Sequence, residues 1–233
     1  DALQQARAAA SMNPGSAPAH STLGLLLLLN NDPWAADQQF AQAVELAPSL
    51  AEARTGWAQA LQRQGRFREA MGQQETALAL DTDSASTQNN LGAIYAARGE
   101  FESAVGHLKQ AIDLQPGWGM PYANLALVYL EQARYAPALE MAERAVDLGE
   151  RSPFIYTVLA RIYTRQGRTD QALAALRQAV ALDPQYPQAH YQLSRLYLEQ
   201  DRARDAVREI LAALTHDPSA MLESRLYARS EAT

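Results

Sequence analysis

The feature that most constrains this chain is an internal repeat of 34 residues, which runs through nearly all of its 233 residues. Six consecutive frames align without a gap, and two of their columns hold alanine every time. A repeat of this length is typical of stacked architectures, in which each unit buries its hydrophobic face only against its neighbours. The six frames cover residues 17–50, 51–84, 85–118, 119–152, 153–186 and 187–220.

Each frame is interpreted as two antiparallel helices, called A and B here. Position 8 of the frame is always small, position 11 is Leu or Tyr, and position 28 is aliphatic. Small residues allow two helices to approach closely, and the larger ones fill the remaining space. The 11 prolines fall only in turns or first helical turns, where they cost little. The invariant alanines, at positions 20 and 27, are Ala36, Ala70, Ala104, Ala138, Ala172 and Ala206, and Ala43, Ala77, Ala111, Ala145, Ala179 and Ala213.

The stretch "NNLGAIYAARGEFESAVGHLKQAIDLQP", residues 89–116, contains Leu-Gly-x-x-Tyr, then Gly-x-Phe-x-x-Ala and a closing proline. This pattern closely resembles the tetratricopeptide repeat, a helix-turn-helix unit of 34 residues. The resemblance implies an all-α fold, a right-handed superhelical solenoid forming a single domain over residues 1–233. Residues 1–16 match helix B of a preceding repeat, and we expect residues 221–233 to form a capping or partial helix.

Composition limits the partners of the chain. The formal net charge is −6, and nucleic-acid binding needs a basic surface, so we expect no nucleic-acid partner. The chain has no cysteine, which excludes disulfides and thiolate metal sites. Because the longest apolar run is far shorter than the roughly 20 residues of a membrane-spanning helix, we also expect no membrane insertion.

That run is "STLGLLLLLN", residues 21–30, in the first helix A. Leu23 and Leu27 are predicted to lie in the core. Leu25, Leu28 and Leu29 occupy positions that tetratricopeptide proteins turn toward their concave groove, so no partner for their burial is evident. Two explanations stay open: a preceding helix covers them, or they form an apolar groove floor or a self-association surface that supports a homodimer.

The central repeats carry asparagines at position 6, Asn90 and Asn124, with Asn89 beside the first. Equivalent positions in adjacent repeats lie roughly 10 Å apart, so Asn90 and Asn124 are predicted to form a two-rung amide ladder. An amide both donates and accepts hydrogen bonds, so a ladder can hold a peptide backbone without reading its sequence. The pattern is similar to the asparagine ladder of the repeat domain of O-GlcNAc transferase. The alternative is that these amides cap or satisfy neighbouring helices.

The last two repeats place three arginines at groove positions, Arg161, Arg165 and Arg195, with Tyr191 nearby in the sequence. The planar guanidinium group binds carboxylates and phosphates in a bidentate manner. These residues therefore predict contact with an acidic or C-terminal segment of a partner. The alternative is a solvated helix face neutralised by Glu199 and other acids.

No arrangement typical of catalysis is present in the sequence. The four histidines are dispersed and show no metal-ligand spacing. We therefore expect no catalytic residues, no metal site and no cofactor.

The sequence predicts a non-enzymatic scaffold that binds an extended peptide segment or a partner protein in its concave groove. Two alternatives stay open. One is the substrate-docking domain of a larger enzyme, such as a glycosyltransferase or sulfotransferase. The other is a structural part of a bacterial envelope or export complex. The candidate locations are the bacterial cytoplasm and the periplasm or cell envelope.

Overall fold

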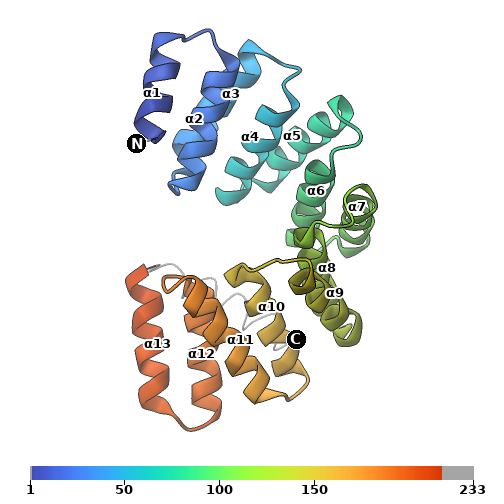
Figure 1. Ribbon diagram of the computed structural model, residues 1–233, viewed down its shortest axis with the longest axis vertical. Helices are drawn as coiled ribbons and strands as arrows, with labels where there is room; N and C mark the ends of the chain where they lie inside the picture. The colour runs from blue at the N-terminus through green and yellow to red at the C-terminus, as the bar shows by residue number, and fades with distance from the viewer. Residues whose placement is uncertain (1, 217–233) are drawn as a thin grey trace. The chain divides into compact units, whose positions relative to one another are not determined.

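The computed structural model describes residues 2–216, and these residues form 13 α-helices and no strand (Figure 1). The two helices of each repeat are antiparallel, and the fold class is that of an all-α solenoid. The helices are α1 (Ala2–Met12), α2 (Ala17–Leu29), α3 (Pro33–Leu46), α4 (Ala51–Arg63), α5 (Phe67–Leu80), α6 (Ala85–Ala97), α7 (Phe101–Leu114), α8 (Gly119–Glu131), α9 (Tyr135–Asp147), α10 (Pro153–Arg165), α11 (Thr169–Leu182), α12 (Pro187–Glu199) and α13 (Ala203–His216).

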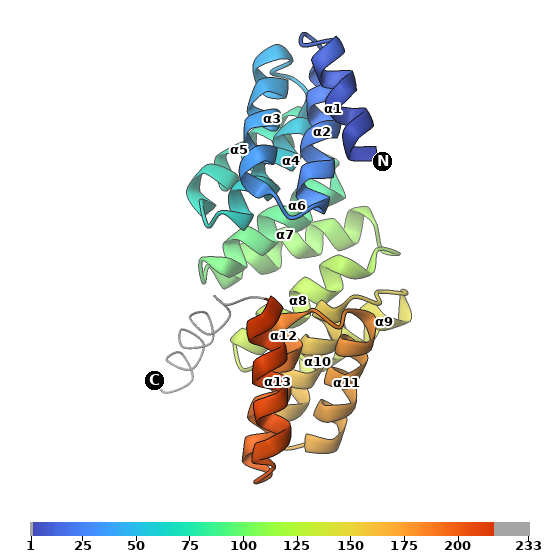
Figure 2. The same cartoon turned by 90° about the vertical axis from the view of Figure 1, so that its left-hand side faces the viewer.

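The chain divides into two compact units, which are described separately. Unit 1, Asp1–Gly117, contains α1 to α7, and unit 2, Trp118–Thr233, contains α8 to α13. Within each unit, each helix A lies against its own helix B, as Figure 2 also shows from the side. The expectation of one continuous domain stays a prediction, and the predicted helix at 221–233 lies outside the described residues.

The six A helices begin at the first residues of the six frames, Ala17 to Pro187. The alanines at position 20 are 0% exposed in all six repeats. No helix of the described residues precedes α1, which matches a helix B, and its alanine at position 20, Ala2, is exposed. Position 20 therefore marks where helices A and B of one repeat meet: a Cβ atom on Gly92 of α6 would lie 3.3 Å from the carbonyl oxygen of Ala104 on α7.

Close approach of helices is clearest around Phe40, which is 0% exposed. A Cβ atom on Gly24 would lie 2.9 Å from the Phe40 ring, and one on Gly56 would lie closer still. The two glycines on α2 and α4 thus leave room for one large aromatic ring from α3. The glycines give space to Phe40, the largest fully buried side chain among the described residues of unit 1.

The turn between helices A and B has one backbone geometry throughout. Position 15 has a positive φ in every repeat, and the N–H of position 16 donates to the carbonyl of position 11 at 2.8–2.9 Å. This six-to-one bond across a left-handed residue is the Schellman motif. It brings position 16 back over position 11. Position 15 is Asn31, Gly65, Gly99, Ala133, Gly167 and Asp201.

Candidate partner-binding surface

The leucine run of α2 is divided between core and surface. Leu25 and Leu29 are 47% and 79% exposed, so no helix of the described residues buries these two side chains, and their predicted binding role stays a prediction. The expectation that Leu28 has no partner for its burial is wrong, because Leu28 is 4% exposed. Leu28 belongs to the same hydrophobic cluster as Leu27 and Ala60, because α4 packs against α2.

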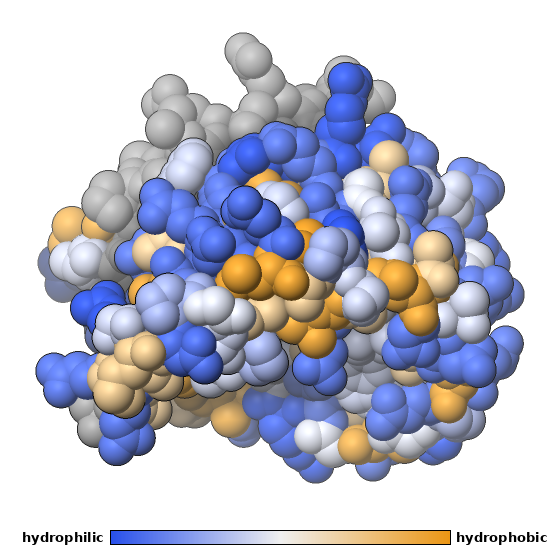
Figure 3. All heavy atoms as spheres, turned by 90° about the horizontal axis from the view of Figure 1, so that it is seen from above, coloured by the Kyte–Doolittle hydropathy of each residue, from blue (hydrophilic) through white to orange (hydrophobic). Residues whose placement is uncertain are grey.

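Other hydrophobic side chains of unit 1 are also exposed. Met12 and Trp34 are 80% and 64% exposed, and the leucines that close helices α3 and α5, Leu46 and Leu80, are 40% and 45% exposed. Figure 3 shows one face of the molecule, on which hydrophobic side chains form a short band bordered by hydrophilic ones. On that face the hydrophobic surface is therefore concentrated in this band.

The asparagines predicted to contact a ligand differ in burial. Asn89 is 5% exposed and has a polar partner, whereas Asn90 is half-buried and its Nδ2 atom is buried without a hydrogen-bond partner. Asn124 belongs to unit 2 and is also half-buried, with a partner of its own. Because each unit is described by itself, the ladder of Asn90 and Asn124 stays a prediction.

A second unsatisfied amide was not foreseen from the sequence. Gln74 on α5 is 0% exposed, and neither its Nε2 nor its Oε1 atom has a hydrogen-bond partner. It stands at position 24, where Phe40 and Leu108 fill the core of the neighbouring repeats of unit 1. A buried amide without partners costs about 1–3 kcal/mol, so this layer of unit 1 is weakened relative to its neighbours.

The arginines predicted at the groove of unit 2 have acidic neighbours. Arg161 donates to Glu131 Oε1 at 2.6 Å, from α10 to α8. Arg195 lies 3.8 Å from Glu199 along α12. Arg165 is exposed and has a polar contact, and Tyr191 is half-buried. Glu131 and Glu199 therefore compensate two of the three guanidinium charges, and the binding role of the arginines stays a proposal.

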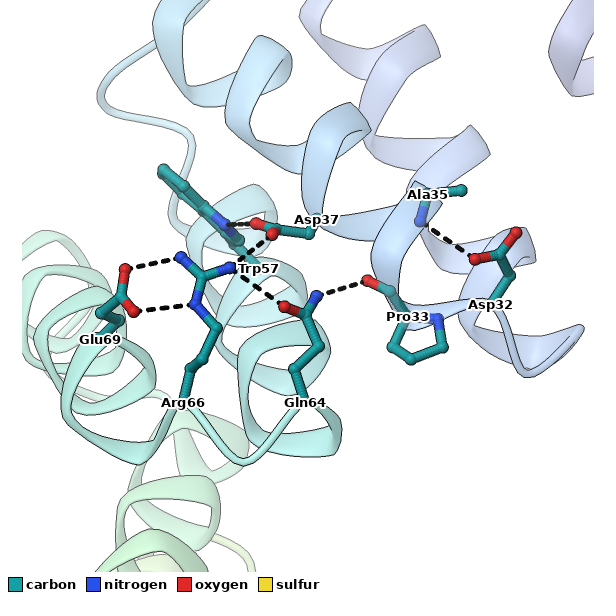
Figure 4. A network of polar contacts seen from close by, with 8 residues as sticks. All are labelled: Asp32, Pro33, Ala35, Asp37, Trp57, Gln64, Arg66 and Glu69. Atoms are coloured by element: carbon teal, nitrogen blue, oxygen red, sulfur yellow. Dashed lines mark hydrogen bonds and ion pairs between the residues drawn. The ribbon is translucent and has the colours of Figure 1, made fainter.

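A polar network that was not predicted links α3, α4 and α5 in unit 1 (Figure 4). Asp37 accepts from Trp57 Nε1 at 2.6 Å and from Arg66 Nη1 at 2.7 Å. Arg66 also pairs with Glu69 through two hydrogen bonds. The hydrogen bond to Glu69 and the nearby charge of Asp37 hold the pKa of Arg66 above its usual range, and the hydrogen bond from Arg66 holds the pKa of Glu69 below its own. The network ties two adjacent repeats together.

Unit 2 places arginines over tyrosines at the same turns. The guanidinium carbon lies 4.3–4.6 Å from the ring centroid in three pairs, within the range of cation–π attraction. Each pair joins position 11 to position 16, which the turn geometry brings together. A sequence signal existed, since arginine recurs at position 16. The pairs are Tyr129 with Arg134, Tyr163 with Arg168, and Tyr197 with Arg202.

The residue at position 4 joins three segments in several repeats. His20 lies 3.0 Å from the carbonyl of Pro14 and 2.8 Å from Gln39 Oε1, and Arg54 makes the equivalent bonds to Pro48 and Gln73. In unit 2, His190 lies 2.9 Å from the carbonyl of Pro184 and 2.7 Å from Glu209 Oε2. These two histidines hold the preceding turn, helix A and helix B together. Their role is structural.

Among the side chains that the structure describes, no three His, Asp or Glu residues come together as a metal site. None of the helices α1 to α13 is both long and apolar enough to cross a membrane.

Family models confirm the repeat. A model described as "Tetratricopeptide repeat" matches residues 49–117 and 83–151, and one described as "TPR repeat" matches residues 160–201. Together they cover more than half of the chain, which therefore belongs to the tetratricopeptide repeat family. Proteins of this family generally act as protein–protein interaction scaffolds. No match was found among curated protein sequences.

Solved structures share the fold. A chain of the APC/C hetero-tetramer Cut9–Hcn1 is 19% identical with a TM-score of 0.83, and the match covers 98% of this chain and 45% of that one. TTC0263, a tetratricopeptide protein of Thermus thermophilus, is 24% identical over 78% of this chain and 100% of its own, with a TM-score of 0.72. PilF of Pseudomonas aeruginosa is 22% identical over 98% and 100%, with a TM-score of 0.65. The chain thus spans less than half the length of the first of these relatives, and the likeness is one of fold.

Proposed function

We propose that the chain is a non-enzymatic scaffold that holds an extended segment of a partner protein along the inward positions of its A helices. The observation that carries the proposal is the exposure of Leu25 and Leu29 on α2, at 47% and 79%. Both lie at repeat positions that tetratricopeptide proteins use for contact. Exposed apolar surface on such a position favours a binding role.

Asn90 on α6 adds a polar element to the same unit. Its Nδ2 donor has no hydrogen-bond partner, and a donor left without one is costly. Because the Asn90 side chain is only half-buried, its amide can turn toward a peptide carbonyl. We therefore propose a partner segment with apolar side chains that contact α2 and a backbone carbonyl that Asn90 holds. In unit 2, Asn124 would hold the peptide backbone in the same way. An acidic or C-terminal segment would contact Arg161, Arg165, Arg195 and Tyr191.

The test is a selection of random displayed peptides against the folded chain, followed by affinity measurements on variants. Leu25→Asp places a charge in the proposed contact and should weaken a selected peptide about tenfold or more, the scale of one interface anchor. Leu46→Asp is the matched control, because Leu46 is 40% exposed on helix B of the same repeat. Equal losses in both variants, or no saturable peptide at all, would refute the proposal.

The same apolar surface supports the expected homodimer. We propose that Leu29 at the end of α2, with Trp34 exposed at the start of α3, drives self-association. Light scattering over a concentration series measures the mass, and Leu29→Asp should convert a dimer to a monomer. A wild-type monomer at all concentrations would exclude self-association and leave the surface to a different partner.

A further inference from the structure

Two arginines on neighbouring turns of unit 2 differ from the ion-paired arginines of the chain. Arg134, between α8 and α9, and Arg168, between α10 and α11, are both exposed. They occupy the same position of adjacent repeats, so they lie on the same edge of the unit. This edge is formed by the A–B turns and is separate from the inward face of the A helices.

The direction of each guanidinium group is set by the fold. The N–H of Arg134 donates to the Tyr129 carbonyl at 2.8 Å, and its guanidinium carbon lies 4.4 Å from the Tyr129 ring centroid. Arg168 repeats this arrangement on Tyr163, at 2.9 Å and 4.6 Å. A side chain held in this way loses less conformational freedom when it binds an anion.

In the part of the chain that the structure describes, no carboxylate neutralises the charges of these two arginines. Arg134 contacts Gln132, and Arg168 contacts Gln166 and Gln171, all of which are neutral amides. Within residues 2–216 neither guanidinium forms an ion pair with a carboxylate. The contrast is with Arg202, which stacks on Tyr197 in the same way but also pairs with Asp205 at 2.6 Å.

We propose that Arg134 and Arg168 form an anion-binding edge for an acidic segment of a partner protein. Equivalent positions in adjacent repeats lie roughly 10 Å apart. A peptide in the polyproline II conformation advances about 3.1 Å per residue with three residues per turn, so carboxylates three residues apart lie on one face of it and match the two arginines. Nucleic acid is the other common polyanion, but a chain with net charge −6 would repel it.

The probe is a fluorescent peptide that repeats Glu-Ser-Ser-Glu, compared with a peptide of the same composition in which the glutamates are adjacent. Fluorescence anisotropy at low salt measures both. The spaced peptide should bind more tightly, and its affinity should fall as salt screens the charges. The double variant Arg134→Gln with Arg168→Gln should weaken the spaced peptide about tenfold, because two exposed charge pairs are lost.

Arg202→Gln is the matched control, because it removes the same stacked arginine at a turn where Asp205 already neutralises it. It should change the affinity less than twofold. A second variant, Arg134→Lys with Arg168→Lys, keeps the charge and should bind between wild type and the glutamine variant. Circular dichroism must show unchanged helicity in each variant, and affinities are compared well below the lowest melting temperature.

The proposal is overturned if the spaced and adjacent peptides bind alike, if the Arg202→Gln control loses as much affinity as the double variant, or if the wild type shows no saturable binding. Its failure is distinguishable from failure of the groove proposal. Leu25→Asp and Arg161→Ala alter inward positions of the A helices and should leave the spaced peptide unaffected. Loss of binding in those variants would place the acidic segment on the groove instead.

Discussion

The turns of unit 2 are built alike, whereas those of unit 1 are all different. In unit 2 all three turns stack an arginine on a tyrosine. In unit 1 the first turn has Asp32 capping α3, the second has Arg66 in a network with Asp37 and Glu69, and the third pairs Arg98 with Glu100 at 2.7 Å. The backbone bond from position 16 to position 11 is nevertheless present in all six.

This difference teaches that the backbone motif defines the turn and that the side chains around it can vary. Unit 1 uses its turn charges internally, in a helix cap and in ion pairs. Unit 2 places its turn arginines over aromatic rings, and there Arg134 and Arg168 contact neutral amides whereas Arg202 pairs with Asp205. The charges of Arg134 and Arg168 are therefore available at the surface. The two units therefore have the same fold but different surfaces for partners.

The largest expected effect comes from removing the aromatic ring that only unit 1 contains at position 24. Phe40→Ala should destabilise unit 1 by about 3–5 kcal/mol, because the ring fills the space between Gly24 and Gly56 and the two helices cannot close it. Hydrogen exchange should show lost protection in α2 to α4 with α10 to α12 retained. Trp34→Ala, on the same helix but 64% exposed, should cost far less. Equal protection loss in both units would mean that the difference between them does not extend to stability.

Gln74 offers a way to make unit 1 more regular. Gln74→Leu should stabilise the chain by about 1–3 kcal/mol, because it replaces an unsatisfied buried amide with the residue that fills position 24 as Leu108 and Leu176. Denaturant unfolding measures the change. The adjacent Gln73→Leu is the control, since Gln73 accepts a hydrogen bond from Arg54 at 2.9 Å and its loss should not stabilise. A destabilised Gln74→Leu variant would show that the amide is satisfied in solution.

The left-handed residue at position 15 tests whether the two units share their turn energetics. Ala133→Gly should stabilise by about 1 kcal/mol, because alanine is strained at φ 57° and glycine is not. Gly65→Ala in unit 1 and Gly167→Ala in unit 2 should each cost about the same amount. A Cβ would meet nothing within 4 Å at either glycine, so the comparison isolates backbone strain. Opposite signs for the two glycines would show that the turns are not equivalent.

The first residues of the helices could be predicted, because small residues and prolines recur every 34 residues, which is the length of one structural repeat. The burial of Leu28 could not, because position 12 is covered only when the next helix A lies across it, as α4 does here. The residues of the Tyr129–Arg134 pair belong to two columns that recur in the sequence, Tyr at position 11 and Arg at position 16. Joining those columns required the turn geometry, which brings together residues that are five apart.

The candidate site was less predictable than the fold for a related reason. Arg161 and Glu131 lie 30 residues apart, and their ion pair depends on which faces of α8 and α10 meet. Gln74 shows the reverse case, in which a polar residue occupies a core position that the repeat pattern assigns to large apolar ones. Periodicity predicts which positions are buried. It does not predict whether a polar side chain at a buried position finds a hydrogen-bond partner.

The smallest expected effect concerns pH and the one tyrosine of unit 1 that occupies position 11. The ring of Tyr95 stacks on His107, with centroids 5.2 Å apart and an interplanar angle of 4°, instead of on an arginine. Burial lowers the pKa of His107 below its usual value of 6.5, and the negative charge of Glu75 opposes this shift only in part. The neutral imidazole is therefore the form that the folded unit 1 favours.

The sign of the effect follows from linkage. Below pH 6.5 the unfolded chain takes up a proton at His107 more readily than the folded chain, so stability falls as the pH decreases. His107→Gln should remove this part of the pH dependence, because Gln39 and Gln73 occupy the same repeat position. Denaturant unfolding between about pH 5 and 7.5 measures it. Lys109→Gln, on the same helix, is the control, since lysine stays charged over this range. If the free energy of unfolding of His107→Gln depended on pH as that of the wild type does, the pKa of His107 would be the same in the folded and unfolded chain. Stacking and burial would then not affect its protonation.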